Sequence, residues 1–292
     1  LLIHYDFEND FTTDGKAKAS YKELEKLKHL YIGNNGLTNS WDSSAITEIH
    51  EAHRDLIIRF AGVTTSTPEG WSDLDSSKDW AIRYWKLEPS ELKKELEKLQ
   101  YEGGFIFRFK ADGSPQYIHI KDTYSDNDIS ATITKNDISN VTVKPSSFSE
   151  LLTQMDINYE KHPAQDRYST SVSSKNQTSR TNWAILSKEN IKEVNLDAYV
   201  SPTVPTSPSS NPNDDFYTYY DNIFGDIKLI VTFNIVNPKH YNLEIGDIIN
   251  FTDMYPETPY GYNSSNWSNL KFMIVSVQRT VGKLNIIARE IG

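Results

Sequence analysis

The stretch of sequence that decides the fold lies near the carboxyl end and reads Tyr241-Asn242-Leu243-Glu244-Ile245-Gly246-Asp247-Ile248-Ile249-Asn250-Phe251. Its Gly-Asp pair is typical of a turn, and the apolar residues after it indicate the start of a strand. Residues 227–235 alternate apolar and polar side chains, as a strand with one buried face does. Residues 272–278 and 283–290 indicate two further strands around a short turn. We therefore expect an antiparallel β module over residues 213–292 that closes a barrel or a small sandwich and packs with the preceding domain.

A helix followed by a hairpin is the clearest pattern upstream of this module. Residues 90–100 place Leu92, Leu96 and Leu99 on one helical face, and a glycine pair ends the pattern. Two strands with alternating side chains then flank a turn at residues 111–114. The expected fold class is therefore α+β and β-dominated, with a helix–hairpin unit followed by antiparallel β-barrel or sandwich modules.

The pattern divides the chain into three parts. Residues 1–40 form an N-terminal segment, which we interpret as the end of a missing or preceding barrel because it opens on a strand without a partner. Residues 41–200 are expected to form an α+β domain, with a helix at residues 45–60 in addition to the one described above, and a strand at residues 80–87. The four prolines of residues 201–212 predict an extended connection to the β module.

Composition excludes several classes of function. The 292 residues include 30 Lys and Arg, 40 Asp and Glu, and no Cys. The missing thiols exclude disulfide frameworks, thiolate zinc sites, iron–sulfur clusters and a thiol nucleophile. A formal charge of −10 argues against a nucleic-acid groove, which requires surplus cationic side chains. The apolar runs are too short to span a bilayer, so no membrane-spanning segment is expected.

The residues that carry chemistry do not form a recognisable catalytic pattern. His50 and His53 share a helix face, but they are three residues apart and no third ligand is indicated, so we expect a half-buried helix histidine in preference to a metal site. Acidic pairs such as Asp73 and Asp75 are interpreted as solvated loop residues. Phosphate-loop and nucleophile-elbow patterns are absent from the sequence. We therefore expect no enzyme activity, no catalytic residues, no metal and no cofactor.

An aromatic loop over residues 252–270 is the best candidate for a binding surface. It contains Tyr255, Tyr260, Tyr262 and Trp267. Aromatic side chains anchor protein–protein interfaces and also stack on sugar rings. We favour an interface for these four residues, and a carbohydrate-binding or glycoside-active module remains the alternative.

The order of these motifs resembles the closing module of bacteriophage tail hub proteins, also called baseplate hub or tail-tip proteins. The likeness is carried by the "Leu-x-x-Gly-Asp" strand start in residues 241–251, by the strand at residues 271–279, and by a hairpin partner ending in Ala288-Arg289-Glu290. The upstream order of helix, strand, helix and aromatic hairpin is similar too. The likeness covers roughly residues 41–292. This chain departs from the family pattern in lacking an appended spike or lysin domain.

This resemblance implies a non-enzymatic structural role in a virion. Members of the family form rings, usually homotrimers, that join the tail tube to distal tail or baseplate proteins. DNA is then only a passing cargo, and no catalytic residue is carried over to this chain. The resemblance also implies assembly in the host cytoplasm and a final location in the virion tail.

Overall fold

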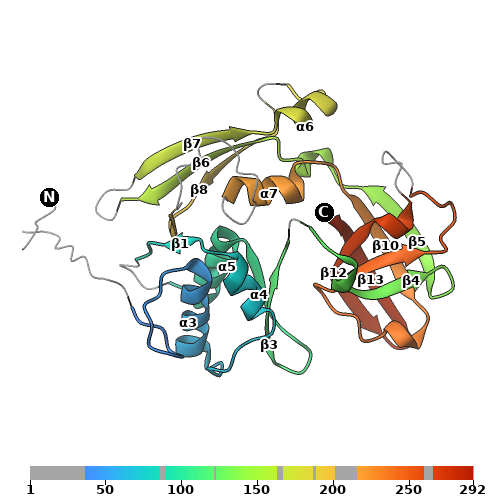
Figure 1. Cartoon of the computed structure of the whole chain (residues 1–292), viewed down its shortest axis with the longest axis horizontal. Helices are drawn as coiled ribbons and strands as arrows, with labels where there is room; N and C mark the ends of the chain where they lie inside the picture. Colours follow the sequence, from blue (N-terminus) through green and yellow to red (C-terminus); the bar gives the residue numbers. More distant parts are fainter. Residues whose placement is uncertain are drawn as a thin grey trace, which may run out of the picture.

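The computed structural model describes residues 37–85, 90–121, 123–162, 167–186, 189–200, 216–259 and 266–291. These residues form two lobes, as Figure 1 shows: a curled six-stranded sheet, and a mixed lobe of helices, a hairpin and small sheets. The fold is α+β and β-dominated, as the sequence predicted. The predicted N-terminal segment lies outside the described residues up to position 36, and so does the proline-rich connection at 201–212.

The six-stranded sheet has the strand order β4-β11-β12-β13-β10-β5. All neighbouring strands are antiparallel except β4 and β11, which run parallel. The strands are β4 (Ile129–Thr134), β5 (Ile138–Pro145), β10 (Leu229–Ile235), β11 (Ile248–Thr252), β12 (Lys271–Thr280) and β13 (Lys283–Ile291). The two outermost strands, β4 and β5, are consecutive in the chain, and the sheet curls into a half-open barrel (Figure 1).

The alternating pattern of β10 explains the core of this barrel. Its odd-numbered residues, including Val231 and Phe233, are buried, while the residues between them are partly exposed. Across the barrel interior, the Phe251 ring of β11 packs edge-on against Phe233 of β10 and Phe272 of β12, with ring centroids 5.4 and 5.3 Å apart. The sequence predicted the strands of residues 213–292 but not that β4 and β5 complete their sheet. Those pairings join segments about one hundred residues apart, which local periodicity does not reveal.

The mixed lobe is built around two helices and a hairpin. Helix α5 buries Leu99 fully and packs beside α3. The hairpin of β2 and β3 follows α5 directly, as predicted. The elements are α3 (Ile49–Ala61), α4 (Trp71–Ser77), α5 (Leu92–Gly103), β2 (Phe105–Phe109) and β3 (Pro115–His119).

Several boundaries differ from the prediction, each for a local reason. The helix expected at residues 45–60 begins at Ile49, because Glu48 takes the extended N-cap conformation. The helix expected at residues 90–100 continues to Gly103 and ends where Gly104 adopts a φ of 65°. Of the strand expected at residues 80–87, the structure describes residues 80–85, and within these β1 (Ala81–Ile82) pairs with β9 (Tyr199–Val200).

A three-stranded sheet and an aromatic helix complete the mixed lobe. The sheet has the order β7-β6-β8, with β6 and β7 antiparallel and β6 and β8 parallel. Helix α7 was not predicted from the sequence; its aromatic side chains pack on Trp80 and Tyr101. The elements are β6 (Gln154–Lys161), β7 (Tyr168–Lys175), β8 (Ile191–Asn195), α6 (Gln177–Asn182) and α7 (Phe216–Phe224). The short 3-10 helices are η1 (Asp126–Asp128), η2 (Phe148–Glu150), η3 (Pro238–His240) and η4 (Trp267–Asn269).

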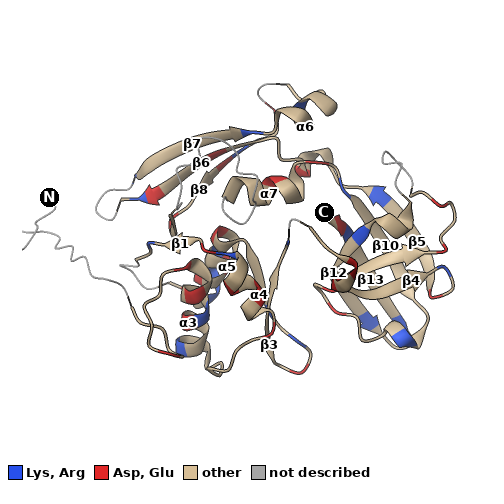
Figure 2. Cartoon of the chain, viewed as in Figure 1, with Lys and Arg blue, Asp and Glu red and all other residues tan. Residues whose placement is uncertain are grey.

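The two lobes contact each other through apolar and charged side chains. Ile118 of the hairpin packs with Ile248 and Met273 of the barrel sheet. Beside this contact, Arg108 donates a hydrogen bond to Glu244 over 2.5 Å. Acidic and basic residues are interspersed over both lobes (Figure 2). Among the described helices, none has the length and apolar character needed to cross a bilayer.

Candidate functional site

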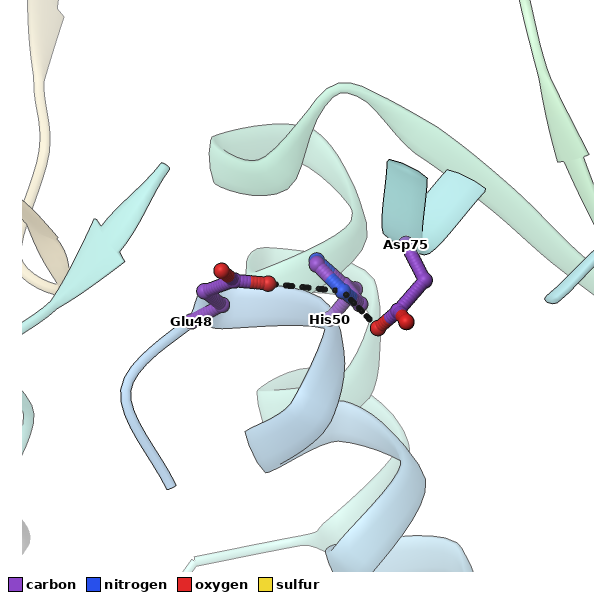
Figure 3. A group of neighbouring side chains, drawn as sticks. All are labelled: Glu48, His50 and Asp75. Atoms are coloured by element: carbon purple, nitrogen blue, oxygen red, sulfur yellow. Dashed lines mark hydrogen bonds and ion pairs between the residues drawn. The ribbon is translucent and has the colours of Figure 1, made fainter. Parts of the chain in front are cut away.

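Three titratable side chains converge where α3 begins, as Figure 3 shows. The Nε2 atom of His50 lies 3.0 Å from Oε2 of Glu48 and 3.1 Å from Oδ1 of Asp75. His50 lies in the first turn of α3, Glu48 is the N-cap of that helix, and Asp75 comes from α4. The imidazole is buried, whereas the Asp75 side chain is 48% exposed. The cluster therefore joins two helices and opens to solvent on the side of Asp75.

Contacts around the cluster hold its side chains in place. Glu48 and Glu51 form a capping box, in which each carboxylate accepts a hydrogen bond from the other residue's backbone N–H. Trp71, the first residue of α4, meets the His50 imidazole edge-on with ring centroids 5.1 Å apart. Because two of the three side chains have such neighbours, their orientations are restricted before any ligand arrives.

His53, one turn further along α3, faces a different environment. Its Nδ1 atom lies 3.0 Å from the Tyr117 hydroxyl, and its ring packs edge-on against Phe105 and Phe107. Burial lowers the pKa of His53 to about 3, and the nearby His50 contributes in the same direction. His53 is therefore neutral at neutral pH, and the two imidazoles singled out by the sequence do not converge.

The acidic residues of α4 divide between two histidines. Asp75 faces His50, whereas the carboxylate of Asp73 lies 3.5 Å from Nδ1 of His119 and 3.3 Å from Nζ of Lys121. The sequence interpretation, which assigned both acidic residues to solvated loops, did not anticipate either contact. The partners of His50 are two residues before it and 25 residues after it. No helical or strand period connects such positions, so the sequence carried no signal for this cluster beyond the acidic pair itself.

The arrangement has two chemical uses. A protonated imidazole can share its Nε2–H between two carboxylates, and a neutral imidazole can join the same carboxylates around a divalent cation. One side-chain atom each of Glu48, His50 and Asp75 lies within 4.8 Å of the other two, a separation that suits both the shared hydrogen bond and the cation.

The aromatic loop, the binding surface expected from the sequence, is divided between surface and core. Tyr255 is 92% exposed, whereas Trp267 is 5% exposed. The Trp267 indole packs against Phe251 and Phe272, and its Nε1 donates a hydrogen bond to the Pro256 carbonyl over 3.0 Å. Trp267 therefore belongs to the barrel core and does not form a flat ring platform with Tyr255.

The other two expected interface residues, Tyr260 and Tyr262, lie outside the described residues. The described part of the loop still borders a groove of about 370 Å³ beside the sheet-edge strand β5. Its lining is mainly apolar and includes Val141, Val143 and Met254. Tyr255 and Trp267 both line this groove, and of the two only Tyr255 is exposed to solvent.

Several solved structures are similar to this chain. No protein-family model and no curated protein matches the sequence. A chain of the gene transfer agent virion has 10% sequence identity and a TM-score of 0.52 over 83% of this chain. This chain spans about half of that one, 47% of its length. A tail protein from Neisseria meningitidis has 8% identity, a TM-score of 0.48, and coverage of 88% of this chain and 69% of its own.

A prophage tail protein from Listeria monocytogenes is similar over 72% of this chain and 55% of its own length, with 12% identity and a TM-score of 0.40. At such low sequence identities, the comparison concerns the course of the backbone and carries no information on the site residues. The similarity to the gene transfer agent chain therefore establishes a shared fold. It does not assign a role to the cluster of Glu48, His50 and Asp75.

Proposed function

We propose that this chain is a non-enzymatic structural subunit of a phage-type tail, located at the hub where the tail tube meets the distal tail or baseplate. Its partners are further copies of itself in a ring, with a homotrimer expected, and neighbouring tail proteins. DNA passes such a ring only as cargo. Assembly takes place in the host cytoplasm, and the mature location is the virion.

The observation that carries this proposal is the fold shared with the gene transfer agent virion chain over 83% of the present chain. That extent includes more than a single common module, because neither lobe alone accounts for so much of the chain. The motif order in the sequence supports the same class independently of the backbone comparison. Fold alone does not define function, so the role in the tail requires its own test.

The surface of the chain is compatible with assembly. Large apolar side chains are exposed on both lobes; they include Phe60, Phe148, Leu186, Tyr255 and Val281. Single exposed apolar residues are common in monomers. The groove beside Tyr255 is different, because an exposed aromatic side chain borders an apolar hollow next to a sheet edge. Interfaces concentrate their binding energy at aromatic anchors in such settings.

The mass of the assembled species tests the ring. We expect native mass spectrometry of the purified chain to show a trimer. Tyr255→Ser should weaken that trimer by roughly tenfold or more, the loss expected for an anchor worth about 1.4 kcal/mol or more. Val281→Ser is the matched control, because this fully exposed residue lies in the turn between β12 and β13, away from the groove lining.

The outcomes separate the parts of the proposal. A monomer at all concentrations contradicts the self-assembled ring. A trimer that dissociates equally in both variants contradicts the specific role of the aromatic loop. For the location, an antibody raised against the chain should label the distal end of the tail tube in electron micrographs of particles, and label confined to the head would contradict a tail role.

A further inference from the structure

The cluster of Glu48, His50 and Asp75 brings one imidazole nitrogen and two carboxylates together at a point that the proposed tail role does not involve. We infer that these three side chains bind one divalent transition-metal ion of the zinc type, and that the ion links α3 to α4. The inference concerns a binding site and does not depend on the tail role proposed above.

The ligand atoms already lie close to metal-binding separations. Two ligands about 2.0 Å from a tetrahedral zinc ion are about 3.3 Å apart. The two observed distances from the His50 Nε2 atom, 3.0 Å to Glu48 and 3.1 Å to Asp75, are close to that value. The carboxylate oxygens lie within 4.8 Å of each other, and the exposed Asp75 side chain can rotate to shorten that distance. Three protein ligands leave the fourth position for water, as in open zinc sites.

The hydrogen-bonding capacity of His50 favours a cation at this point. An imidazole Nε2 carries at most one hydrogen, yet two carboxylate oxygens approach it at nearly equal distances. One N–H cannot make two linear hydrogen bonds, so His50 can donate a well-aligned hydrogen bond to only one of the two carboxylates. A divalent ion would contact both oxygens and the nitrogen at once.

The balance of charge points the same way. Two carboxylates face an imidazole that carries at most one positive charge. Arg54 adds positive charge nearby, but its Nη2 group donates hydrogen bonds to the Thr65 and Ser66 carbonyls. Asp73 on the same helix provides the contrast, because it has both a histidine and a lysine as partners. A doubly charged ion held by a neutral His50 would neutralise the two carboxylates.

The surroundings supply an oriented site and an entry path. The capping box positions Glu48, and the edge of Trp71 supports the His50 ring. His50 is nearly inaccessible, whereas the Asp75 side chain is 48% exposed, so an ion would enter past Asp75. Since the ligands come from two helices, binding should stabilise the folded chain relative to the unfolded one.

The test measures zinc binding to the full 292-residue chain after removal of metal with a chelator. We expect equilibrium dialysis with elemental analysis to give one tightly bound Zn²⁺ per chain, and added Zn²⁺ to raise the thermal midpoint. Asp75→Asn should reduce the affinity by roughly tenfold or more, since it weakens a direct ligand. Asp73→Asn is the matched control, because it removes a similarly exposed carboxylate of α4 that pairs with His119 and Lys121 and not with His50.

A second readout identifies the nitrogen ligand without a buried substitution. Zinc bound at His50 should shift the imidazole ¹⁵N resonance of Nε2, while the His53 resonances stay in place. The inference is overturned if zinc does not saturate at one ion per chain, if Asp75→Asn binds as tightly as the parent, or if Asp73→Asn loses as much affinity as Asp75→Asn. A shift at another histidine in place of His50 would overturn it as well.

Discussion

Replacing Glu102 should destabilise the mixed lobe more than its single carboxylate suggests. This side chain at the end of α5 is buried, and it accepts hydrogen bonds from the backbone N–H groups of Asp197, Ala198 and Tyr199 over 3.1, 2.7 and 3.0 Å. Burial raises the pKa of Glu102, although the N–H groups of Ala198 and Asp197 oppose that rise. The carboxylate therefore holds the backbone of the segment that leads into β9.

The magnitude follows from what Glu102→Ala leaves behind. Each buried N–H that loses its partner costs about 1–3 kcal/mol, and three groups are affected. Because the wild-type carboxylate is itself destabilised by burial, and because water can reach the Asp197 end, we expect a net loss of about 3–5 kcal/mol. At roughly 2–4 °C per kcal/mol, the thermal midpoint should fall by about 6–20 °C.

Urea unfolding followed by tryptophan fluorescence provides the assay. Glu102→Gln keeps one acceptor oxygen and should lose an intermediate amount of stability. Glu97→Ala on the exposed side of the same helix should change the unfolding free energy by less than about 0.5 kcal/mol. If Glu102→Ala unfolds within about 1 kcal/mol of the parent chain, the three N–H groups find other partners and the reasoning fails.

Two further predictions concern acid sensitivity and backbone geometry. Burial alone would raise the pKa of Asp137, but hydrogen bonds from Thr134 and Asn237 outweigh it and hold that pKa far below its ordinary value of 3.8. A carboxylate whose pKa is lower in the folded chain than in the unfolded chain stabilises the fold at any pH above its unfolded pKa, and this contribution is lost on acidification. The difference in unfolding free energy between the parent and Asp137→Asn should therefore shrink as the pH falls below about 4. A difference that does not depend on pH would contradict this. Gly104→Ala should cost about 2 kcal/mol or more, because φ is 65° and the added Cβ would lie 2.9 Å and 3.0 Å from two aromatic rings. Gly113→Ala at φ 84°, with open space around it, should lose distinctly less in a urea titration, and equal losses would argue against the steric part.

Periodic sequence patterns predicted the helices and strands that depend on residues close together in the sequence. The leucine stripe of α5 and the hairpin after it were both anticipated, because their periods are short and their ends carry glycine or turn residues. Helix α7 was missed, since its aromatic and β-branched composition is more typical of a strand. Its packing on Trp80 and Tyr101 overrides that preference, and both partners lie more than a hundred residues away.

The same limit applied to the candidate site. Spacing drew attention to His50 and His53, whereas the structure separates their rings and brings Asp75 and Glu48 to His50. A side chain in the turn before a helix and another in the next helix share no period, so only the folded chain reveals their meeting. The aromatic loop shows the same limit. Its composition indicated a binding surface, but it did not show that Trp267 is buried in the barrel core.

The position of β13 has a consequence for the continuity of the six-stranded sheet. Strand β13 lies inside the sheet, between β12 and β10, and not at its edge. A polypeptide released just before Lys283 would leave β4, β11 and β12 on one side and β10 and β5 on the other, with no strand bridging them. Strand β13 therefore joins the two halves of the sheet, and a chain without it could not form one continuous six-stranded barrel wall.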